Sequence, residues 1–235
     1  MVFTLAEPLH FVIQGEGKHL GKKMLMIRLV GCNINCIDCD TKYTWQPKAW
    51  NKQKFIKYDL EKITMEILYF KKRFFVNHLL ITGGEPGLWE NHLYSLLSIL
   101  TKENFKFDIE TSGYFDFMKI KQFQDFVIFN ISPKIGDLTS QIQNPFDVVI
   151  LNQKPKNYII KIVVAKDHLR EIYKKIRKLQ KLYHIPSKKI YLMPKGTSRE
   201  EMIEQSEEIL EFCLENGYKF SPRLQILLFN DQKLK

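Results

Sequence analysis

The sequence of 235 residues is 45% hydrophobic and has a formal net charge of +10. This length is sufficient for a substantial core, and no segment is apolar for long enough to cross a bilayer as a helix. The N-terminal residues show neither the basic nor the apolar region of a secretory signal, so we expect a cytoplasmic protein with no membrane partner. Because there is also no Pro/Gly/Ser-rich linker, we expect residues 1–235 to form a single domain.

The positive charge is compatible with a nucleic-acid partner, but the distribution of the lysines favours solvated helix faces. The lysines are scattered, and four of them fit the outer face of one helix, namely Lys174, Lys175, Lys178 and Lys181. A nucleic-acid-binding module would interleave aromatic side chains with a dense basic stripe, and the surroundings of Trp45 and Trp50 form only a weak version of one. We therefore expect no nucleic-acid partner.

Hydrophobic periodicity predicts strands that alternate with helices. In chain order we expect a strand at 24–30, a helix at 59–73, a strand at 79–81, a helix at 89–100, strands at 105–109, 126–131 and 158–164, a helix at 168–183, a strand at 189–193, a helix capped by Ser198 and ended by Gly217, and a last strand at 224–229. Glu201 is the expected capping-box partner of Ser198. The alternation indicates βα units, so the predicted fold class is α/β, a barrel or partial barrel of parallel strands.

The unusual segments of the sequence each follow a predicted strand. They are CNINCIDC at 32–39, TGGEPG at 82–87, ETSG at 110–113, SPK at 132–134 and MPKG at 193–196. Right-handed crossovers place all loops that follow parallel strands on one side of the sheet. The sequence therefore predicts an active site at the C-terminal ends of the strands.

Three of the four cysteines lie in one loop, with the spacing Cys32-x3-Cys36-x2-Cys39. Structural zinc sites usually take four ligands in two separated pairs, whereas three thiolates suit a 4Fe–4S cluster with one iron left open. A zinc knuckle is the alternative interpretation. Cys213 lies in a helical pattern, and we expect it to be a small buried side chain.

The cysteine loop and the segment Gly83-Gly-Glu-Pro86 resemble the radical S-adenosylmethionine superfamily. This resemblance implies a partial (β/α)6-type barrel in which the cluster helps to cleave S-adenosylmethionine. Gly83 and Gly84 let the backbone approach a ligand closely, and Glu85 offers an acceptor for the ammonium group of the cofactor. The residue before the third cysteine is usually aromatic in the superfamily, and here it is Asp38.

A more specific resemblance links nearly the whole chain to the 7-carboxy-7-deazaguanine synthases. It rests on several motifs, namely Gln14-Gly-Glu-Gly17, Cys39-Asp-Thr41, Glu110-Thr-x-Gly113, Ser132-Pro-Lys134, Lys161-x-Val-Val164 and Ser221-Pro-Arg-Leu224. The resemblance implies conversion of 6-carboxy-5,6,7,8-tetrahydropterin into 7-carboxy-7-deazaguanine with loss of ammonia, in queuosine and 7-deazapurine biosynthesis. It also implies Mg²⁺ as a cofactor, a homodimer, and an electron donor such as flavodoxin or ferredoxin.

Individual roles follow from the same resemblance. Thr41 is the expected Mg²⁺ ligand, and the implied catalytic residues are Cys32, Cys36, Cys39, Arg28 and Glu16. Arg28 is expected to bind the substrate carboxylate, and the other substrate-binding residues are Ile13, Gln14, Gly15, Glu16 and Thr111. The S-adenosylmethionine site is expected to include Asp38, Cys39, Asp40, Gly83, Gly84, Glu85, Gly113, Ser132, Pro133 and Lys134.

Some of these roles have simpler alternatives. Arg28 could form a structural ion pair with Glu16, Thr41 could be a loop hydroxyl, and Lys134 could be a surface lysine. For the whole chain, the alternatives are another radical enzyme, such as a glycyl-radical activase, and a metal-stabilised nucleic-acid-binding module. Family members often have His where this chain has Gln225, so the sequence assigns no role to the segment from Gln225 to Lys235.

Overall fold

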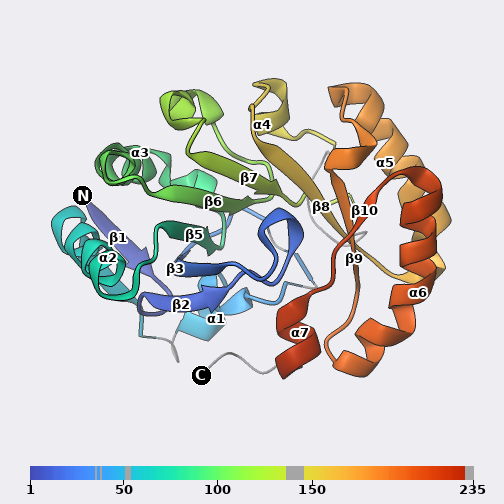
Figure 1. Cartoon of the computed structure of the whole chain (residues 1–235), viewed down its shortest axis with the longest axis horizontal. Coiled ribbons are helices and arrows are strands. Elements are labelled where there is room, and N and C mark those ends of the chain that lie inside the picture. The colour runs from blue at the N-terminus through green and yellow to red at the C-terminus, as the bar shows by residue number, and fades with distance from the viewer. Residues whose placement is uncertain (35, 38, 51–53, 136–145, 231–235) are drawn as a thin grey trace.

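The computed structural model describes residues 1–34, 36–37, 39–50, 54–135 and 146–230. Its strands form one ten-stranded sheet (Figure 1). They are β1 (Val2–Leu5), β2 (His10–Ile13), β3 (Lys23–Leu29), β4 (Ile56–Asp59), β5 (His78–Gly83), β6 (Lys106–Thr111), β7 (Val127–Ile131), β8 (Tyr158–Val164), β9 (Ile190–Pro194) and β10 (Lys219–Phe220). The helices are α1 (Pro47–Trp50), α2 (Leu60–Phe74), α3 (Glu90–Leu100), α4 (Val149–Asn152), α5 (Leu169–Tyr183), α6 (Arg199–Asn216) and α7 (Leu224–Phe229).

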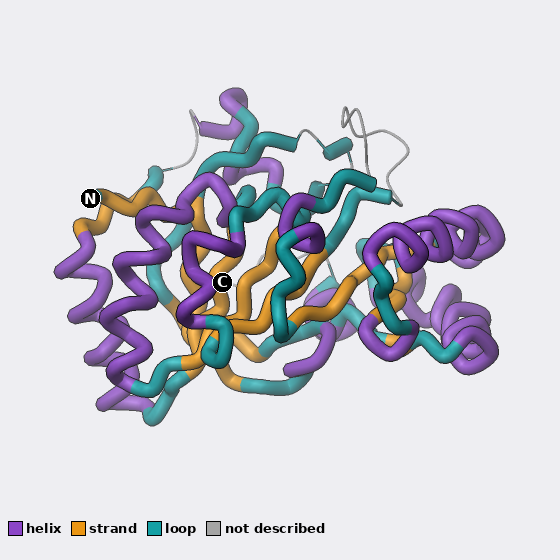
Figure 2. Tube along the Cα trace, turned by 90° about the horizontal axis from the view of Figure 1, so that it is seen from above, coloured by secondary structure: helices purple, strands orange, loops and turns teal. Residues whose placement is uncertain are grey.

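The sheet has the order β10-β9-β8-β7-β6-β5-β3-β1-β4, with β2 beside β3. All pairs from β3 to β10 are parallel, whereas β1, β2 and β4 pair antiparallel at one side. The parallel strands curve into an arc, with α2, α3, α5 and α6 on its outside (Figures 1 and 2). The α/β class and the partial barrel are therefore confirmed. Because one sheet carries strands from both ends of the chain, we propose that residues 1–235 form one domain.

Local signals explain how the main helices begin and end. The Asp59 carboxylate accepts a hydrogen bond from the Lys62 backbone N–H at 2.7 Å and caps α2. Ser198 caps α6 in the same way, and Gly217 ends it with a φ of 66°. The Glu201 carboxylate reaches back to the backbone N–H of Thr197 at 2.7 Å, one residue before the expected partner.

One element was predicted wrongly. Residues 224–229 form the helix α7 and not a strand. A short apolar run has no periodicity that separates a buried strand from a helix. Here β10 already occupies the position beside β9, and α7 satisfies its backbone locally on the concave side of the arc (Figure 1).

The core has two layers because alternate side chains of the parallel strands point to opposite faces. The outward side chains pack against the outer helices in the main cluster, which includes Ile27, Ile81, Phe107 and Ile131. The inward side chains form two small apolar clusters and a set of buried polar groups, namely His78, Asp108, Asn130 and Lys161. Because these polar side chains are buried inside the partial barrel, each of them needs a hydrogen-bond or ionic partner there.

Two further expectations concern single features. Cys213 is buried in α6, as expected. None of the helices in the described part of the chain has both the length and the apolar character of a membrane-spanning segment.

Candidate functional site

The loops that follow β3, β5, β6 and β7 meet at the C-terminal ends of these strands. The backbone N–H of Glu85 donates to the Gly31 carbonyl at 2.8 Å, which joins the loop after β5 to the loop after β3. The Glu85 side chain then reaches the loop after β6, and the backbone N–H of Ser132 donates to the Thr111 carbonyl at 2.8 Å. The predicted convergence of these segments is thus present in the structure.

Two glycines allow the closest of these approaches. A Cβ atom at Gly84 would lie 1.9 Å from the Gly31 carbonyl oxygen, and one at Gly83 would lie 2.1 Å from the Leu29 carbonyl oxygen. Gly83 also has a φ of +136°, which side-chain-bearing residues rarely adopt. The glycines therefore seat the segment Gly83-Gly-Glu-Pro86 directly on the backbone of the cysteine loop.

Two thiols of the cysteine loop accept hydrogen bonds from N–H donors. The Cys32 sulfur accepts from the Ile34 backbone N–H at 3.4 Å, and the Cys39 sulfur accepts from the Trp45 indole Nε1 at 3.3 Å. Burial raises the pKa of the Cys32 thiol, while the Ile34 N–H and the charge of Lys134 act against that rise.

These thiols fit a 4Fe–4S cluster. Hydrogen bonds to sulfur are among the features that tune such clusters, and the three thiols lie in one loop. The Thr41 hydroxyl lies 3.6 Å from the Cys39 sulfur, so the expected Mg²⁺ ligand is next to the expected cluster ligand. Asp38 lies outside the described residues.

The Glu85 carboxylate is a buried junction. It accepts hydrogen bonds from the Thr111 hydroxyl (2.6 Å), the Ser112 hydroxyl and backbone N–H (2.5 and 2.8 Å), and the Gly87 backbone N–H (3.0 Å). Burial raises the pKa of Glu85, and these donors oppose that rise. The Thr111 hydroxyl in turn accepts from the Gly113 N–H at 3.0 Å. Glu85 and Thr111, expected to contact different ligands, thus hold one another in place.

Arg28 pairs with a residue that sequence reasoning did not single out. Its Nε donates to the Glu7 carboxylate at 2.6 Å, so the ion pair forms with Glu7 and not with Glu16. Its Nη2 lies 3.5 Å from the Met26 sulfur. The guanidinium therefore lies on the inner face of β3, at the level of Thr82 on β5.

A buried lysine organises the second half of the site. The Lys161 ammonium lies 2.7 Å from a Glu16 oxygen and 2.5 Å from a Glu110 oxygen, and its side chain is 4% exposed. Burial alone would raise the pKa of Glu16, but Lys161 and Arg223 outweigh it and lower that pKa to about 2. Burial raises the pKa of Glu110. Sequence reasoning quoted Lys161 in a motif without a role, although a lysine within an apolar strand was itself a signal.

The segment that precedes and begins α7 holds the loop that carries Glu16. The Gln225 amide donates to Glu16 at 2.7 Å, the Ser221 hydroxyl accepts from the Gly17 N–H at 2.8 Å, and the Leu224 N–H donates to the Gly15 carbonyl at 3.0 Å. A Cβ atom at Gly15 would lie 2.0 Å from Gln225 Oε1. That Oε1 atom is buried with no hydrogen-bond partner among the described atoms.

Other expected residues surround this network. The Gln14 amide donates to Glu110 at 3.3 Å, and its oxygen accepts from the Glu16 backbone N–H at 3.3 Å. Asp40 lies 3.4 Å from Arg223 Nη2, which links the cysteine loop to the segment before α7. Ile13 ends β2 and is 55% exposed. Gly113 has a φ of +103°, and Ser132, Pro133 and Lys134 follow β7 directly.

Comparison with known proteins agrees with this geometry. Residues 26–209 match the family model of the Radical SAM superfamily. The 7-carboxy-7-deazaguanine synthase of Pyrobaculum aerophilum is 30% identical to this chain over 95% of the chain and 93% of the relative. That of Buchnera aphidicola subsp. Schizaphis graminum is 31% identical over 95% of each.

A solved structure supports the fold. The crystal structure of QueE from Escherichia coli matches 95% of this chain and 94% of its own, with a TM-score of 0.66 and 22% identity. The cysteine loop and the glycine segment agree with these matches, which cover nearly the whole chain. The chain therefore belongs to the Radical SAM superfamily and, within it, to the family of the 7-carboxy-7-deazaguanine synthases.

Proposed function

We propose that this protein converts 6-carboxy-5,6,7,8-tetrahydropterin into 7-carboxy-7-deazaguanine with release of ammonia, in queuosine and 7-deazapurine biosynthesis. The observation that carries the proposal is the buried network of Gln14, Glu16, Glu110 and Lys161. Arg223 links Glu16 of this network to Asp40 of the cysteine loop. A pterin presents an amide–amidine edge that needs both hydrogen-bond donors and acceptors. A glycyl-radical activase, which acts on a protein, has no need of such a set.

The proposed cluster ligands all lie in the cysteine loop. Cys32, Cys36 and Cys39 are the proposed ligands of a 4Fe–4S cluster. When bound and reduced by an external donor, the cluster would supply the electron that cleaves S-adenosylmethionine to methionine and a 5′-deoxyadenosyl radical. The proposed cofactor site comprises Asp38, Asp40, Gly83, Gly84, Glu85, Gly113, Ser132, Pro133 and Lys134.

The substrate edge would meet an ionised carboxylate and two amides. With a pKa of about 2, Glu16 is charged at neutral pH and accepts hydrogen bonds only. A carboxylate offers about four acceptor positions, so Glu16 retains acceptor capacity beside its bonds to Lys161 and Gln225. Gln14 and the buried Gln225 Oε1 supply further polar groups, and the latter is an acceptor for which a substrate N–H is a suitable partner.

The substrate carboxylate has two proposed partners at the other side of the site. Arg28 would bind it through the guanidinium, which can make paired hydrogen bonds to a carboxylate. Thr41 would supply the one protein oxygen to Mg²⁺, an ion that keeps most of its waters. The position of the Thr41 hydroxyl beside the Cys39 sulfur supports this role. Ile13, Gly15 and Thr111 complete the proposed substrate contacts.

The proposed reaction is tested with anaerobically reconstituted protein. Supplied with reductant, S-adenosylmethionine, Mg²⁺ and the carboxypterin, it should form 7-carboxy-7-deazaguanine, detected by mass spectrometry. Cys36→Ala should abolish both this product and 5′-deoxyadenosine. Thr41→Ala should keep the cluster and raise the Mg²⁺ concentration needed by about tenfold. If the wild type releases 5′-deoxyadenosine but never the deazapurine, the protein is a different radical enzyme.

The remaining partners are also proposals. The net charge of +10 supports an acidic electron donor such as flavodoxin or ferredoxin. Reduction by such a donor should slow steeply as salt is added, and a rate independent of salt would exclude electrostatic docking. The cytoplasmic location stays a prediction from the N-terminal sequence. The homodimer stays a prediction from the family resemblance, and sedimentation analysis tests it.

A further inference from the structure

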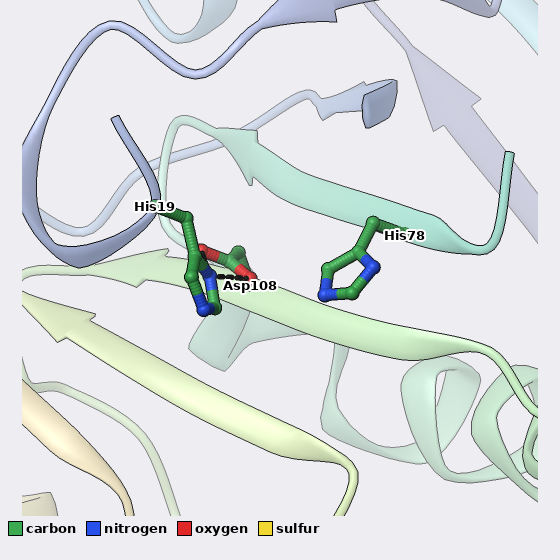
Figure 3. Close-up of side chains that lie close together, drawn as sticks. All are labelled: His19, His78 and Asp108. Carbon is green, nitrogen blue, oxygen red and sulfur yellow. Dashed lines mark hydrogen bonds and ion pairs between the residues drawn. The ribbon is translucent and has the colours of Figure 1, made fainter. Parts of the chain in front are cut away.

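A second cluster of polar side chains lies at the other end of the barrel from the cysteine loop. His19, His78 and Asp108 converge there from three segments (Figure 3). His19 lies in the loop between β2 and β3, His78 is the first residue of β5, and Asp108 is near the start of β6. The cysteine loop and the glycine segment follow the opposite, C-terminal ends of the strands. The cluster is therefore separate from the proposed reaction site.

The three side chains are close together, and two of them are well buried, whereas His19 is 24% exposed. His19 Nδ1 lies 2.9 Å from both carboxylate oxygens of Asp108, and one ligand atom from each of the three residues lies within 4.8 Å of the others. Asp108 is 2% exposed and His78 is 4% exposed. The residues line a cavity of about 180 Å³, whose other charged lining residues are Lys18, Lys22, Lys106 and Asp125.

Neighbouring groups already orient two of the three side chains. The Asn130 amide donates to Asp108 at 3.3 Å and fixes its carboxylate. The Asn77 side-chain oxygen lies 3.3 Å from His78 Nδ1, which favours a proton on that nitrogen. His78 Nε2 then keeps its lone pair and faces the cavity, 2.9 Å from the Lys22 ammonium. Protein metal sites commonly have such outer partners on their histidine and carboxylate ligands.

We propose that His19, His78 and Asp108 form a binding site for one divalent transition-metal ion of the zinc type. Two imidazoles and one carboxylate are a donor set that Zn²⁺ uses, with a fourth position left to water. Bonds of about 2.0–2.1 Å would hold the ligand atoms about 3.4 Å apart. The more widely spaced ligand atoms must therefore move inward by on the order of 1 Å, while His19 Nδ1 and the Asp108 oxygens, now 2.9 Å apart, must give up their hydrogen bond and separate slightly. The Lys22 ammonium must leave His78, and a flexible lysine chain can do so.

Lys22 therefore acts as an internal competitor for the metal. In the structure its ammonium lies 2.9 Å from His78 Nε2, and its charge also acts on the Asp108 carboxylate. Removing this cation should favour an external one. The proposal thus predicts opposite effects for substitutions of a ligand and of the competitor, which a general loss of folding cannot mimic.

A metal at this place would also support the substrate loop. His19 is three residues after Glu16, in the same short 3-10 helix as Gly17 (Gly17–His19). The ion would attach this loop to β5 and β6 through His19. The loop would then be fixed both at His19 and at Glu16, which binds Lys161 and Gln225.

The test is zinc binding by the protein with its cluster in place. The reconstituted enzyme is dialysed against Zn²⁺, and zinc and iron per chain are measured together. Zinc-edge X-ray absorption then identifies the ligands. We expect one Zn²⁺ per chain with nitrogen and oxygen neighbours at about 2.0–2.1 Å and no sulfur at about 2.3 Å.

Variants separate the ligand roles. His78→Gln and Asp108→Asn should each weaken zinc binding by at least about tenfold. Lys22→Met should strengthen it by about tenfold, and the matched control Lys18→Met, in the same cavity, should change it much less. Sulfur neighbours, no bound zinc at full cluster occupancy, or unchanged binding in His78→Gln would each overturn the proposal. Iron content and product formation are read separately, so failure here leaves the proposed reaction untouched.

Discussion

At the scale of single residues, the charge balance inside the barrel depends on Lys161. It is the cation between Glu16 and Glu110, and all three side chains are at least four-fifths buried. Removing one partner from a buried ionic group leaves charge without compensation, which typically costs about 3–5 kcal/mol. Lys161→Met should therefore destabilise the protein by about that amount at neutral pH, measured by urea unfolding.

A second substitution tests the cause of that loss. Glu110→Gln in the Lys161→Met background should recover much of the stability, because one of the two facing charges is gone. The pH dependence should also change. Burial raises the pKa of Glu110 even beside Lys161, which opposes that rise, so removing the lysine should raise it further. Protonation then favours the folded state, so the single variant should gain stability as the pH falls through that pKa. A Lys161→Met protein as stable as the wild type at pH 7 would contradict this reading of the network.

In the wild type, the contribution of Glu16 to stability has the opposite sense at acidic pH. The pKa of Glu16 is lowered from 4.5 to about 2, so its contribution to stability is complete above pH 4.5. That contribution is lost as the pH falls from about 4.5 to about 2.

The sequence motifs identified Gln14 and Glu16 but not their partners, because the pairing joins residues more than 90 positions apart.

At the scale of elements, α7 and the loop that it contacts form the least predictable part of the site. The helices with capping residues were predicted nearly to the residue, because Asp59, Ser198 and Gly217 act locally. The apolar run of α7 has no such internal signal. Its position depends on contacts with Gly15 and Glu16, which lie about 200 residues earlier. Local sequence cannot contain that information.

The contact between α7 and Gly15 gives a prediction at this scale. Gly15→Ala would place a methyl group 2.0 Å from Gln225 Oε1 and displace the first turn of α7. Overpacking of this kind costs about 1–3 kcal/mol, and we expect a raised KM for the pterin together with reduced stability.

Removing the obstructing side chain should relieve the clash. In the double variant Gly15→Ala with Gln225→Ala, the loss of stability should be smaller than the sum of the two single losses. Additive losses would show that the two residues do not contact each other in solution.

At the scale of the whole molecule, the architecture was predictable because the same pattern, a strand followed by an unusual loop, recurs along the chain. Six predicted strands correspond to β3, β5, β6, β7, β8 and β9, and the loops with unusual composition follow their C-terminal ends. Parallel pairing brings those ends together without any knowledge of side-chain contacts. The antiparallel strands β1, β2 and β4 were not predicted, since short edge strands carry little periodicity. The polar interior of the barrel was also missed, because it arises only when separate strands curve together.

The central claim is that three thiols of one loop hold a cluster with an open iron that binds S-adenosylmethionine. Electron paramagnetic resonance of the reduced, anaerobically reconstituted protein, recorded with and without S-adenosylmethionine, tests it most directly. We predict about four iron atoms per chain and a spectrum that changes when the cofactor is added. Zinc in place of iron in the cysteine loop, or a cluster spectrum unaffected by S-adenosylmethionine, would contradict the account.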